Sequence, residues 1–135
     1  MIYTSYFAML RKLPKNFIPI SICGKAPDWY DGLRYKKLAP KYDFFMKWKK
    51  NHDNDFYVKC YKEQVTDMLH VDKVVRELQA KLPSEIWRQL DEPIWLSSKC
   101  NIVLMCYEKP SDFCHRHLVS KWLRDNGYFC KELEL

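Results

Sequence analysis

The chain has 135 residues, of which 47% are hydrophobic and 16% aromatic, so we expect one hydrophobic core and a single α/β domain over residues 1–135. The formal net charge of +6 favours anionic partners such as nucleotides or nucleic acid, although many basic proteins have no such partner. Only 3 glycines are present, which excludes a glycine-rich phosphate loop as the main binding device, and no apolar run approaches the roughly 18 residues of a membrane span.

The N-terminal segment and the cysteines both bear on the compartment. Residues 1–10 lack the basic head, apolar run and cleavage site of a signal peptide, so we expect a cytoplasmic protein. In a reducing cytoplasm the six cysteines are expected to be thiols, some of them buried and some of them ligands or nucleophiles. None belongs to a CxxC pair, which argues against a structural zinc knuckle.

The first third of the chain predicts two strands and a long loop. Residues 1–6 and 17–23 are rich in the β-branched and aromatic side chains typical of strands, and residues 7–13 between them predict one or two helical turns. Pro19 has no backbone N–H to donate, so we expect it at a sheet edge or at the beginning of its strand. Residues 25–40 contain prolines and a glycine and predict a loop, and a loop of this length is often functional.

Helices dominate the middle of the chain. Apolar side chains recur there at helical spacing, and prolines and candidate N-cap residues separate the segments. The expected helices cover residues 40–51, 53–68, 71–82 and 84–90.

The clearest strand covers residues 101–106, which are apolar on both faces, as in a central strand that is covered on both sides. After a turn, Ser111 is the expected N-cap of a helix that runs to about Asp125, and residues 128–133 predict a last strand. Strands separated by helices predict an α/β fold, with a small, mostly parallel sheet flanked by helices in a Rossmann-like three-layer arrangement. Such sheets bind ligands at the carboxyl ends of their strands.

Reactive side chains follow this central strand. Cys106 and Glu108 lie at its carboxyl end, and Cys114 would be the third residue of the helix that Ser111 caps. The unpaired N–H groups and the dipole of a helix start stabilise a thiolate or a bound anion, and Arg116 suits bidentate contact with phosphate or carboxylate. We predict that the two cysteines and Glu108 are the catalytic residues and that Arg116 binds the ligand.

Further ligand-binding residues are expected near this site. The end of the first strand would form a neighbouring wall, and the loop after the second strand mixes basic residues, which attract phosphate, with aromatic residues, which stack on bases. The candidates are Thr4, Ser5 and Tyr6 in the first group and Lys25, Trp29 and Tyr30 in the second.

Each of these residues also has a purely structural interpretation. His115 lies within the apolar stripe of its helix, as a buried histidine would, and the two cysteines are equally compatible with core thiols. Glu108 is equally compatible with a solvent-exposed carboxylate in a turn, and Arg116 with a surface charge.

A nucleophile hypothesis treats Cys114 as a thiolate, with Glu108 or a histidine as its proton acceptor.

A metal site is another interpretation of the same segment. Its ligands would be Cys106, Cys114 and either His115 or His117, with Cys23 from the end of the second strand as a further ligand. This set of ligands suits zinc.

Two short motifs are the most specific features of the chain, namely residues 104–108 (Leu-Met-Cys-Tyr-Glu) and residues 114–116 (Cys-His-Arg). Together with the weaker matches Tyr3-Thr4-Ser5, Leu38-Ala39-Pro40 and Phe56 with Tyr61, they resemble a family known as domain of unknown function 488. The resemblance extends over nearly the whole chain. It implies a small α/β fold with a polar pocket near these motifs, and it implies no assigned reaction.

The sequence thus predicts a cytoplasmic protein whose pocket of cysteine, glutamate and arginine binds a nucleotide-like or nucleic-acid ligand, with or without enzymatic turnover. One alternative is a cysteine- or metal-dependent enzyme that acts on a small molecule, with zinc as its cofactor. Another is a non-catalytic protein-interaction module that uses the aromatic loop at residues 29–35. No membrane partner is expected, and the sequence does not define the oligomeric state.

Overall fold

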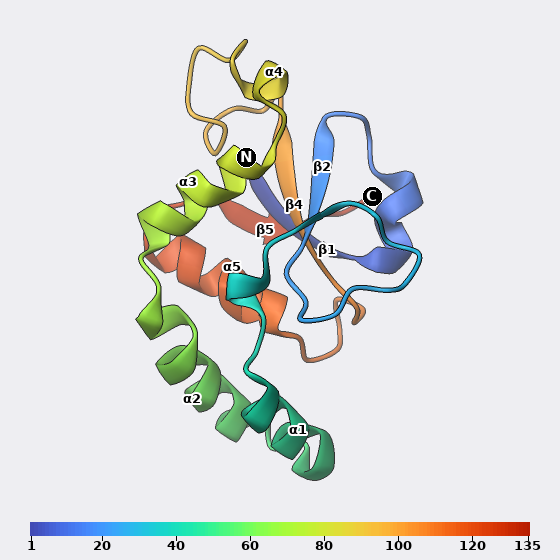
Figure 1. Cartoon of the computed structure of the whole chain (residues 1–135), viewed down its shortest axis with the longest axis vertical. Coiled ribbons are helices and arrows are strands. Elements are labelled where there is room, and N and C mark those ends of the chain that lie inside the picture. The colour runs from blue at the N-terminus through green and yellow to red at the C-terminus, as the bar shows by residue number, and fades with distance from the viewer.

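A five-stranded sheet forms the centre of the computed structural model, which describes residues 1–135 (Figure 1). The strands lie in the order β3-β2-β4-β1-β5, and every neighbouring pair is parallel. The predicted α/β fold is confirmed, and the carboxyl ends of all five strands share one edge. The strands are β1 (Ile2–Tyr6), β2 (Phe17–Ser21), β3 (Leu33–Arg34), β4 (Asn101–Cys106) and β5 (Cys130–Glu132).

Helices lie between most of the strands, and the four helices predicted between residues 40 and 90 are all present with slightly different ends. None of the helices combines the length and the apolar character that crossing a membrane requires. The α-helices are α1 (Tyr42–Asn51), α2 (Asn54–Gln64), α3 (Val71–Lys81), α4 (Ser84–Trp87) and α5 (His115–Asp125). The 3-10 helices are η1 (Phe7–Lys12), η2 (Lys36–Leu38) and η3 (Thr66–Met68).

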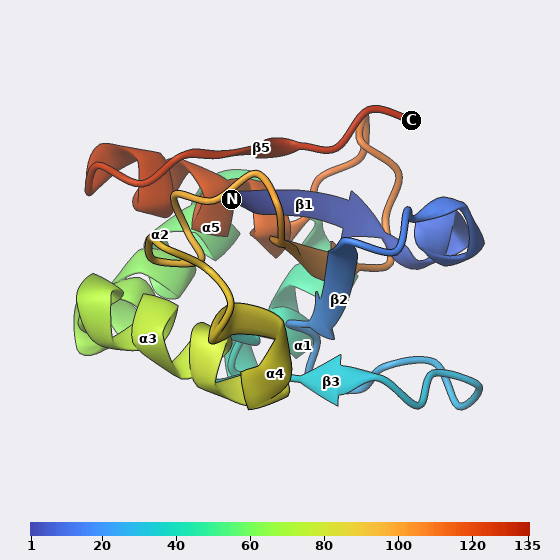
Figure 2. The ribbon, with the colours of Figure 1, turned by 90° about the horizontal axis from the view of Figure 1, so that it is seen from above.

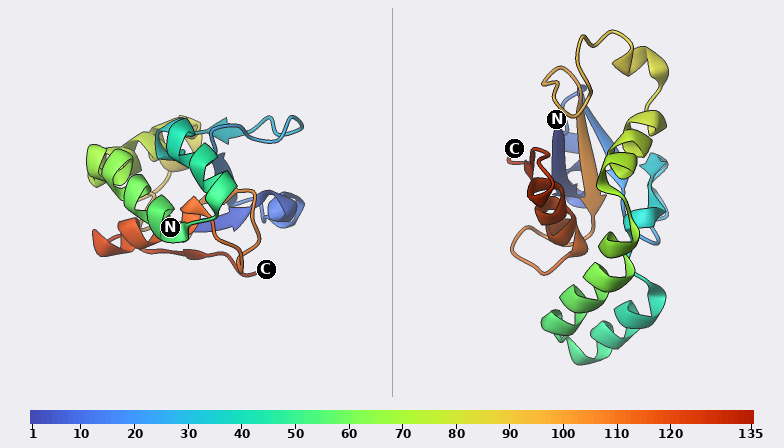
Figure 3. Two further views of the ribbon diagram at one scale, coloured as in Figure 1. Left: turned by 90° about the horizontal axis from the view of Figure 1, so that it is seen from below. Right: turned by 90° about the vertical axis from the view of Figure 1, so that its left-hand side faces the viewer.

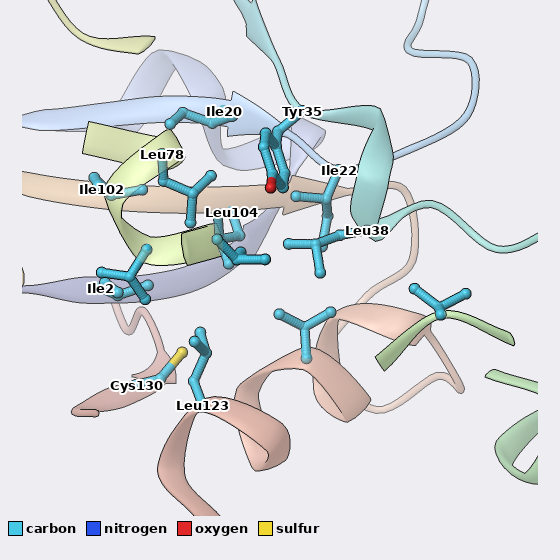
Figure 4. Close-up of a cluster of buried hydrophobic side chains, with 14 of the residues drawn as sticks. Ile2, Ile20, Ile22, Tyr35, Leu38, Leu78, Ile102, Leu104, Leu123 and Cys130 are labelled. Carbon is cyan, nitrogen blue, oxygen red and sulfur yellow. The ribbon is translucent and has the colours of Figure 1, made fainter. Parts of the chain in front are cut away.

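The two faces of the sheet are covered by different layers. On one face, Ile102 and Leu104 of β4 belong to the same buried cluster as Leu78 of α3 and Leu123 of α5 (Figure 4). On the other face, Val103 and Met105 of β4 belong to a smaller cluster, which η1 and the loop after β2 complete. Figure 2 shows η1 across the sheet from α3. Because β4 is buried on both sides, its side chains are apolar from Ile102 to Cys106, as the sequence predicts.

The hairpin of α1 and α2 lies beyond the carboxyl edge of the sheet. Figures 1 and 3 show these two helices past the ends of β2 and β4 rather than on a face of the sheet. Their contacts are mainly aromatic: Phe44 of α1 meets Tyr57 of α2 edge to face, with ring centroids 5.2 Å apart. This arrangement brings a helix over the edge where an α/β sheet binds its ligands.

The structure differs from the prediction in the loop that follows β2. Residues 25–40 contain the two-residue strand β3 and the 3-10 helix η2, so this segment is not structureless. Pro19 lies inside β2, which has a neighbour on each side, so the expectation of an edge strand is wrong. The proline is tolerated because β3 pairs with β2 only from Ile20 onward.

Candidate functional site

Cys106 lies at the centre of a cluster of sulfur, nitrogen and carboxylate atoms. Its Sγ is 3.5 Å from the Sγ of Cys23 and 3.5 Å from Nδ1 of His115. An oxygen of the Glu108 carboxylate is 3.7 Å from the same sulfur. Cys23 follows β2, Cys106 ends β4 and His115 begins α5. The parallel topology brings these side chains together because β2 and β4 are neighbours that end at the same edge.

The hydrogen bonds of His115 define which ring nitrogen carries the proton. Nε2 lies 2.9 Å from the backbone carbonyl oxygen of Ile22. A carbonyl oxygen only accepts, so Nε2 must donate, and in the neutral ring Nδ1 is then an acceptor with a free lone pair. That lone pair faces the Cys106 sulfur. The side chain is buried, as its place in the apolar stripe predicts, but it also contributes to the cluster.

Cys114 precedes α5 and does not lie within it. Its backbone is extended, with φ −156° and ψ 143°, and it is the N-cap residue of the helix. Ser111 lies in a turn, in which the N–H of Asp112 donates to the carbonyl of Lys109 at 3.0 Å. The predicted N-cap at Ser111 is therefore wrong, because this turn ends before the helix begins.

The surroundings of Cys106 and Cys114 raise the pKa of both thiols and so favour their protonated forms. The hydrogen bond with Cys106 and then burial raise the pKa of Cys114 well above its usual value. For Cys106, the hydrogen bond with Cys114 lowers the pKa, but the hydrogen bond with Cys23 and burial outweigh it, and the pKa lies well above the ordinary range. The net shift of the Cys114 pKa is thus upward, opposite to the shift that a thiolate stabilised by the helix start would show.

The cysteine cluster forms part of the wall of a cavity of about 790 Å³ between the sheet edge and α1. Exposed residues, including Lys25, Lys49, Tyr42 and Tyr107, also line it and form its outer part. The remaining aromatic wall comes from α1, α2 and the loop before α5. Its members are Phe45, Trp48, Tyr57 and Phe113.

Arg116 is fully buried and its guanidinium is engaged within the protein. Nε and one terminal nitrogen donate to the two carboxylate oxygens of Glu132 at 3.0 and 2.8 Å. The other terminal nitrogen donates to the backbone carbonyl of Glu108 at 2.6 Å. Burial lowers the pKa of Arg116, but the Glu132 carboxylate more than compensates and the net shift is upward. Arg116 does not line the cavity, and it fixes the loop that carries Glu108.

The three candidates from β1 lie beside this ion pair. Thr4 is buried and donates its hydroxyl to Glu132 at 2.6 Å. Ser5 is also buried. The ring of Tyr6 has the guanidinium carbon of Arg116 5.7 Å from its centroid. None of the three lines the cavity, so β1 supports the loop from behind.

The loop after β2 brings only one of its candidates to the cavity. Lys25 lines it, whereas Trp29 and Tyr30 do not. Tyr30 is buried, and its hydroxyl donates to the carbonyl of Leu33 at 2.6 Å. Trp29 is 63% exposed and meets the ring of Phe7 edge to face. Tyr30 is therefore part of the core, and the aromatic residues that line the cavity come mainly from α1.

Sequence reasoning missed the partner of Arg116 and most of the aromatic wall. Glu132 ends the last strand, and its register partner in β1 is Thr4, a pairing that required knowledge of the strand order. The available signal was the predicted strand at residues 128–133. Phe45 and Trp48 were recognised as an apolar helical stripe, but nothing in that pattern distinguishes a cavity wall from a core.

Three side chains of the cluster can hold a metal ion. The ligand atoms of Cys106, Cys114 and His115 lie within 4.8 Å of one another. Histidine ligands of metals commonly donate their other ring N–H to a carbonyl, and the bond from His115 to Ile22 is of this kind. His117 is not in this group, and its Nε2 is buried without a hydrogen-bond partner.

A family model described as "Active DUF488-N3 subclade" matches residues 9–127. This range contains Cys23 and both specific motifs, residues 104–108 and 114–116, whereas Thr4 and Glu132 lie outside it. No curated protein and no solved structure matches the chain. Because the family model covers most of the sequence, the chain belongs to the DUF488 family, within its DUF488-N3 subclade.

Proposed function

We propose that this chain binds a nucleotide-like or nucleic-acid ligand in the cavity and acts on it with the Cys106 thiol. The position of Cys106 carries the proposal, because its sulfur lies in the wall of an open cavity, 3.5 Å from Nδ1 of His115. A thiol beside an oriented proton acceptor is the arrangement that cysteine nucleophiles use. The cytoplasm, where thiols stay reduced, is the compartment that suits it.

The walls of the cavity support this class of ligand. Its volume of about 790 Å³ lies within the usual range for small-molecule sites. Aromatic side chains such as Trp48 and Phe45 offer faces on which a base stacks. Exposed Lys25 and Lys49 supply positive charge for phosphate groups at the outer part of the same cavity. An aromatic interior with a cationic outer part fits a planar ligand that bears an anionic group.

The residues around Cys106 have separate roles in this proposal. His115 accepts the thiol proton at Nδ1 while the carbonyl of Ile22 fixes the orientation of the ring. The resulting thiolate attacks an electrophilic atom of the bound ligand. Glu108 is near enough to exchange a proton with the leaving group, and Arg116 positions it by holding its backbone carbonyl.

A thermal-shift screen of nucleosides, nucleotides and short single-stranded oligonucleotides tests ligand binding. A ligand at 100 times its dissociation constant adds about 2.7 kcal/mol to the free energy of unfolding. Lys49→Gln should weaken binding of each anionic hit, whereas the matched variant Lys59→Gln, an exposed lysine of α2 outside the cavity, should not. Affinity that falls steeply with salt indicates a nucleic acid. The absence of any hit, or equal effects of the two variants, contradicts the proposal.

A metal-dependent enzyme is the second candidate, and one specific observation favours it. Cys106, Cys114 and His115 bring two sulfurs and one imidazole nitrogen together, a set that suits zinc and leaves a fourth position for water or substrate. A bound zinc ion would act as a Lewis acid on the ligand. In this case Cys106 serves as a ligand of the metal and not as the nucleophile.

Metal analysis separates the two candidates. Protein that has been stripped with a chelator and then dialysed against zinc should retain one equivalent if the second candidate holds. Cys114→Ser should lose that zinc, whereas Cys60→Ser, a cysteine outside the cavity, should retain it. Binding that is weak and unchanged by Cys114→Ser eliminates the zinc site and leaves the thiol mechanism.

A further inference from the structure

The sulfur atoms of Cys23 and Cys106 are in direct contact, with 3.5 Å between them. Cys106 is the last residue of β4, and Cys23 lies two residues beyond the end of the neighbouring parallel strand β2, where the N–H of Ile22 still donates to Met105. The backbone hydrogen bond at Ile22 keeps the two segments adjacent at this point, which brings the two sulfur atoms into contact. A disulfide bond is about 2.05 Å long, so side-chain rotation must close a gap of about 1.5 Å.

We propose that Cys23 and Cys106 form a reversible disulfide, in which Cys23 is the resolving thiol for an oxidised Cys106. Both residues line the open cavity, so a small oxidant in solvent reaches them. Cys23 is not among the three residues that can hold a metal ion, so this role is separate from metal binding.

The 3.5 Å contact between the two sulfurs favours Cys23 as the partner of Cys106. Cys114 is the other sulfur in the cluster, and it is the N-cap residue of α5, where the start of the helix fixes its backbone. The remaining cysteines do not line the cavity. Two of them, Cys100 and Cys130, are buried in the cluster on the far side of the sheet.

The chemistry balances with a peroxide as the oxidant. The Cys106 thiolate attacks one peroxide oxygen, the O–O bond breaks, and with the thiol proton the products are a sulfenic acid and water. The Cys23 sulfur then attacks the sulfenic sulfur, the S–O bond breaks, and the departing oxygen leaves as a second water with the Cys23 proton. In total, two thiols and one hydrogen peroxide give one disulfide and two waters. An external dithiol reverses the oxidation.

The disulfide would switch off the site described above. It occupies the Cys106 sulfur, which is the nucleophile in one candidate function and one of three metal ligands in the other. This consequence rests on the proposed function, whereas formation of the bond itself requires neither a bound ligand nor a metal ion.

Peptide mapping after mild oxidation tests the inference. Fully reduced protein is treated with one equivalent of hydrogen peroxide, the remaining thiols are blocked in denaturant, and the digest is analysed without reduction. We expect a cross-linked peptide pair that contains Cys23 and Cys106 and disappears after treatment with dithiothreitol. Cys23→Ser should lack the cross-link and should accumulate a Cys106 sulfenic acid that dimedone traps. The control Cys60→Ser should behave as the wild type does.

The wild-type map is decisive by itself, so the result does not depend on whether the Cys23 variant folds. A Cys106–Cys114 cross-link overturns the inference, and so does a wild-type Cys106 that oxidises to sulfinic acid without any cross-link. If the bond forms in protein that binds neither zinc nor nucleotides, the inference stands and the proposed function fails. If zinc or a nucleotide binds but the bond does not form, the inference alone fails.

Discussion

His115 donates its Nε2–H to the backbone carbonyl of Ile22 at 2.9 Å, and this bond determines what the site can do. The carbonyl belongs to the residue that follows β2, so the sheet itself orients the imidazole ring. Nδ1 is thereby left as an acceptor that faces Cys106. The same geometry serves a thiol nucleophile or a metal ligand.

The tautomer of His115 is directly measurable. Two-dimensional NMR of the ¹⁵N-labelled protein should show a neutral ring that is protonated at Nε2 and not at Nδ1. His115→Phe keeps an aromatic ring beside Tyr61 but leaves the Ile22 carbonyl without a donor, so it should lower the free energy of unfolding by about 1–3 kcal/mol. A ring protonated at Nδ1, or a variant as stable as the wild type, contradicts this description.

The Arg116–Glu132 ion pair should be a large contributor to stability. Glu132→Gln leaves a fully buried guanidinium without its carboxylate, and we expect a loss of about 3 kcal/mol or more. The matched variant Asp125→Asn disrupts the exposed Lys121–Asp125 pair and should cost about 0–1 kcal/mol. Urea unfolding measures both, and equal losses would show that the buried pair contributes no more than a surface pair.

Substitution at Gly32 tests the structural role of Tyr30. An added Cβ at Gly32 would lie 2.6 Å from the Tyr30 hydroxyl oxygen, which must then move away from the carbonyl of Leu33. We expect Gly32→Ala to destabilise the protein by about 1–3 kcal/mol. At Gly24 the added Cβ meets only the Cβ of Ala39 at 3.9 Å, so Gly24→Ala should be close to neutral. A neutral Gly32→Ala would indicate that Tyr30 is free to leave its buried position.

The hydrogen bond between Tyr35 and Glu77 should make stability depend on alkaline pH. Burial, together with the hydrogen bond to the Glu77 carboxylate at 2.8 Å, raises the pKa of Tyr35. The unfolded phenol loses its proton near pH 10 while the folded one keeps it, so the stabilising contribution is present below about pH 10 and is lost above it. The stability difference between wild type and Tyr35→Phe should therefore shrink from about pH 8 to about pH 11. A constant difference in urea unfolding would contradict the raised pKa.

Local sequence patterns were sufficient for the elements that positioned the site. The apolar run at residues 101–106 predicted β4 with its observed bounds, and the rule that ligands bind at strand ends placed Cys106 and Glu108 correctly at the carboxyl edge. The family resemblance joined them to residues 114–116, which the structure also brings to Cys106. These signals are short in range, because each depends on one strand and the residues that follow it.

Contacts between distant segments were not predictable in the same way. Arg116 was expected to face a ligand, whereas it pairs with Glu132. This partner was missed because it lies in β5, and the order of the strands in the sheet is not encoded in the local sequence. The strand β3 is only two residues long and lies in a segment with prolines, so no periodicity reveals it. The helix α5 begins later than predicted because Ser111 belongs to the turn after β4. Serine is common in turns as well as at N-caps, so the sequence did not distinguish the two.

Selective alkylation of Cys106 tests the central claim most directly. Cys106 and Cys130 are each 2% exposed, but only Cys106 lines the cavity. The native, reduced protein is treated with iodoacetamide, and labelling at each cysteine is followed by peptide mass spectrometry. We predict that Cys106 reacts in the folded protein whereas Cys130 reacts only after unfolding. If Cys106 is as unreactive as Cys130, the cavity and His115 together do not make the thiol available for reaction, and the account of the site is wrong.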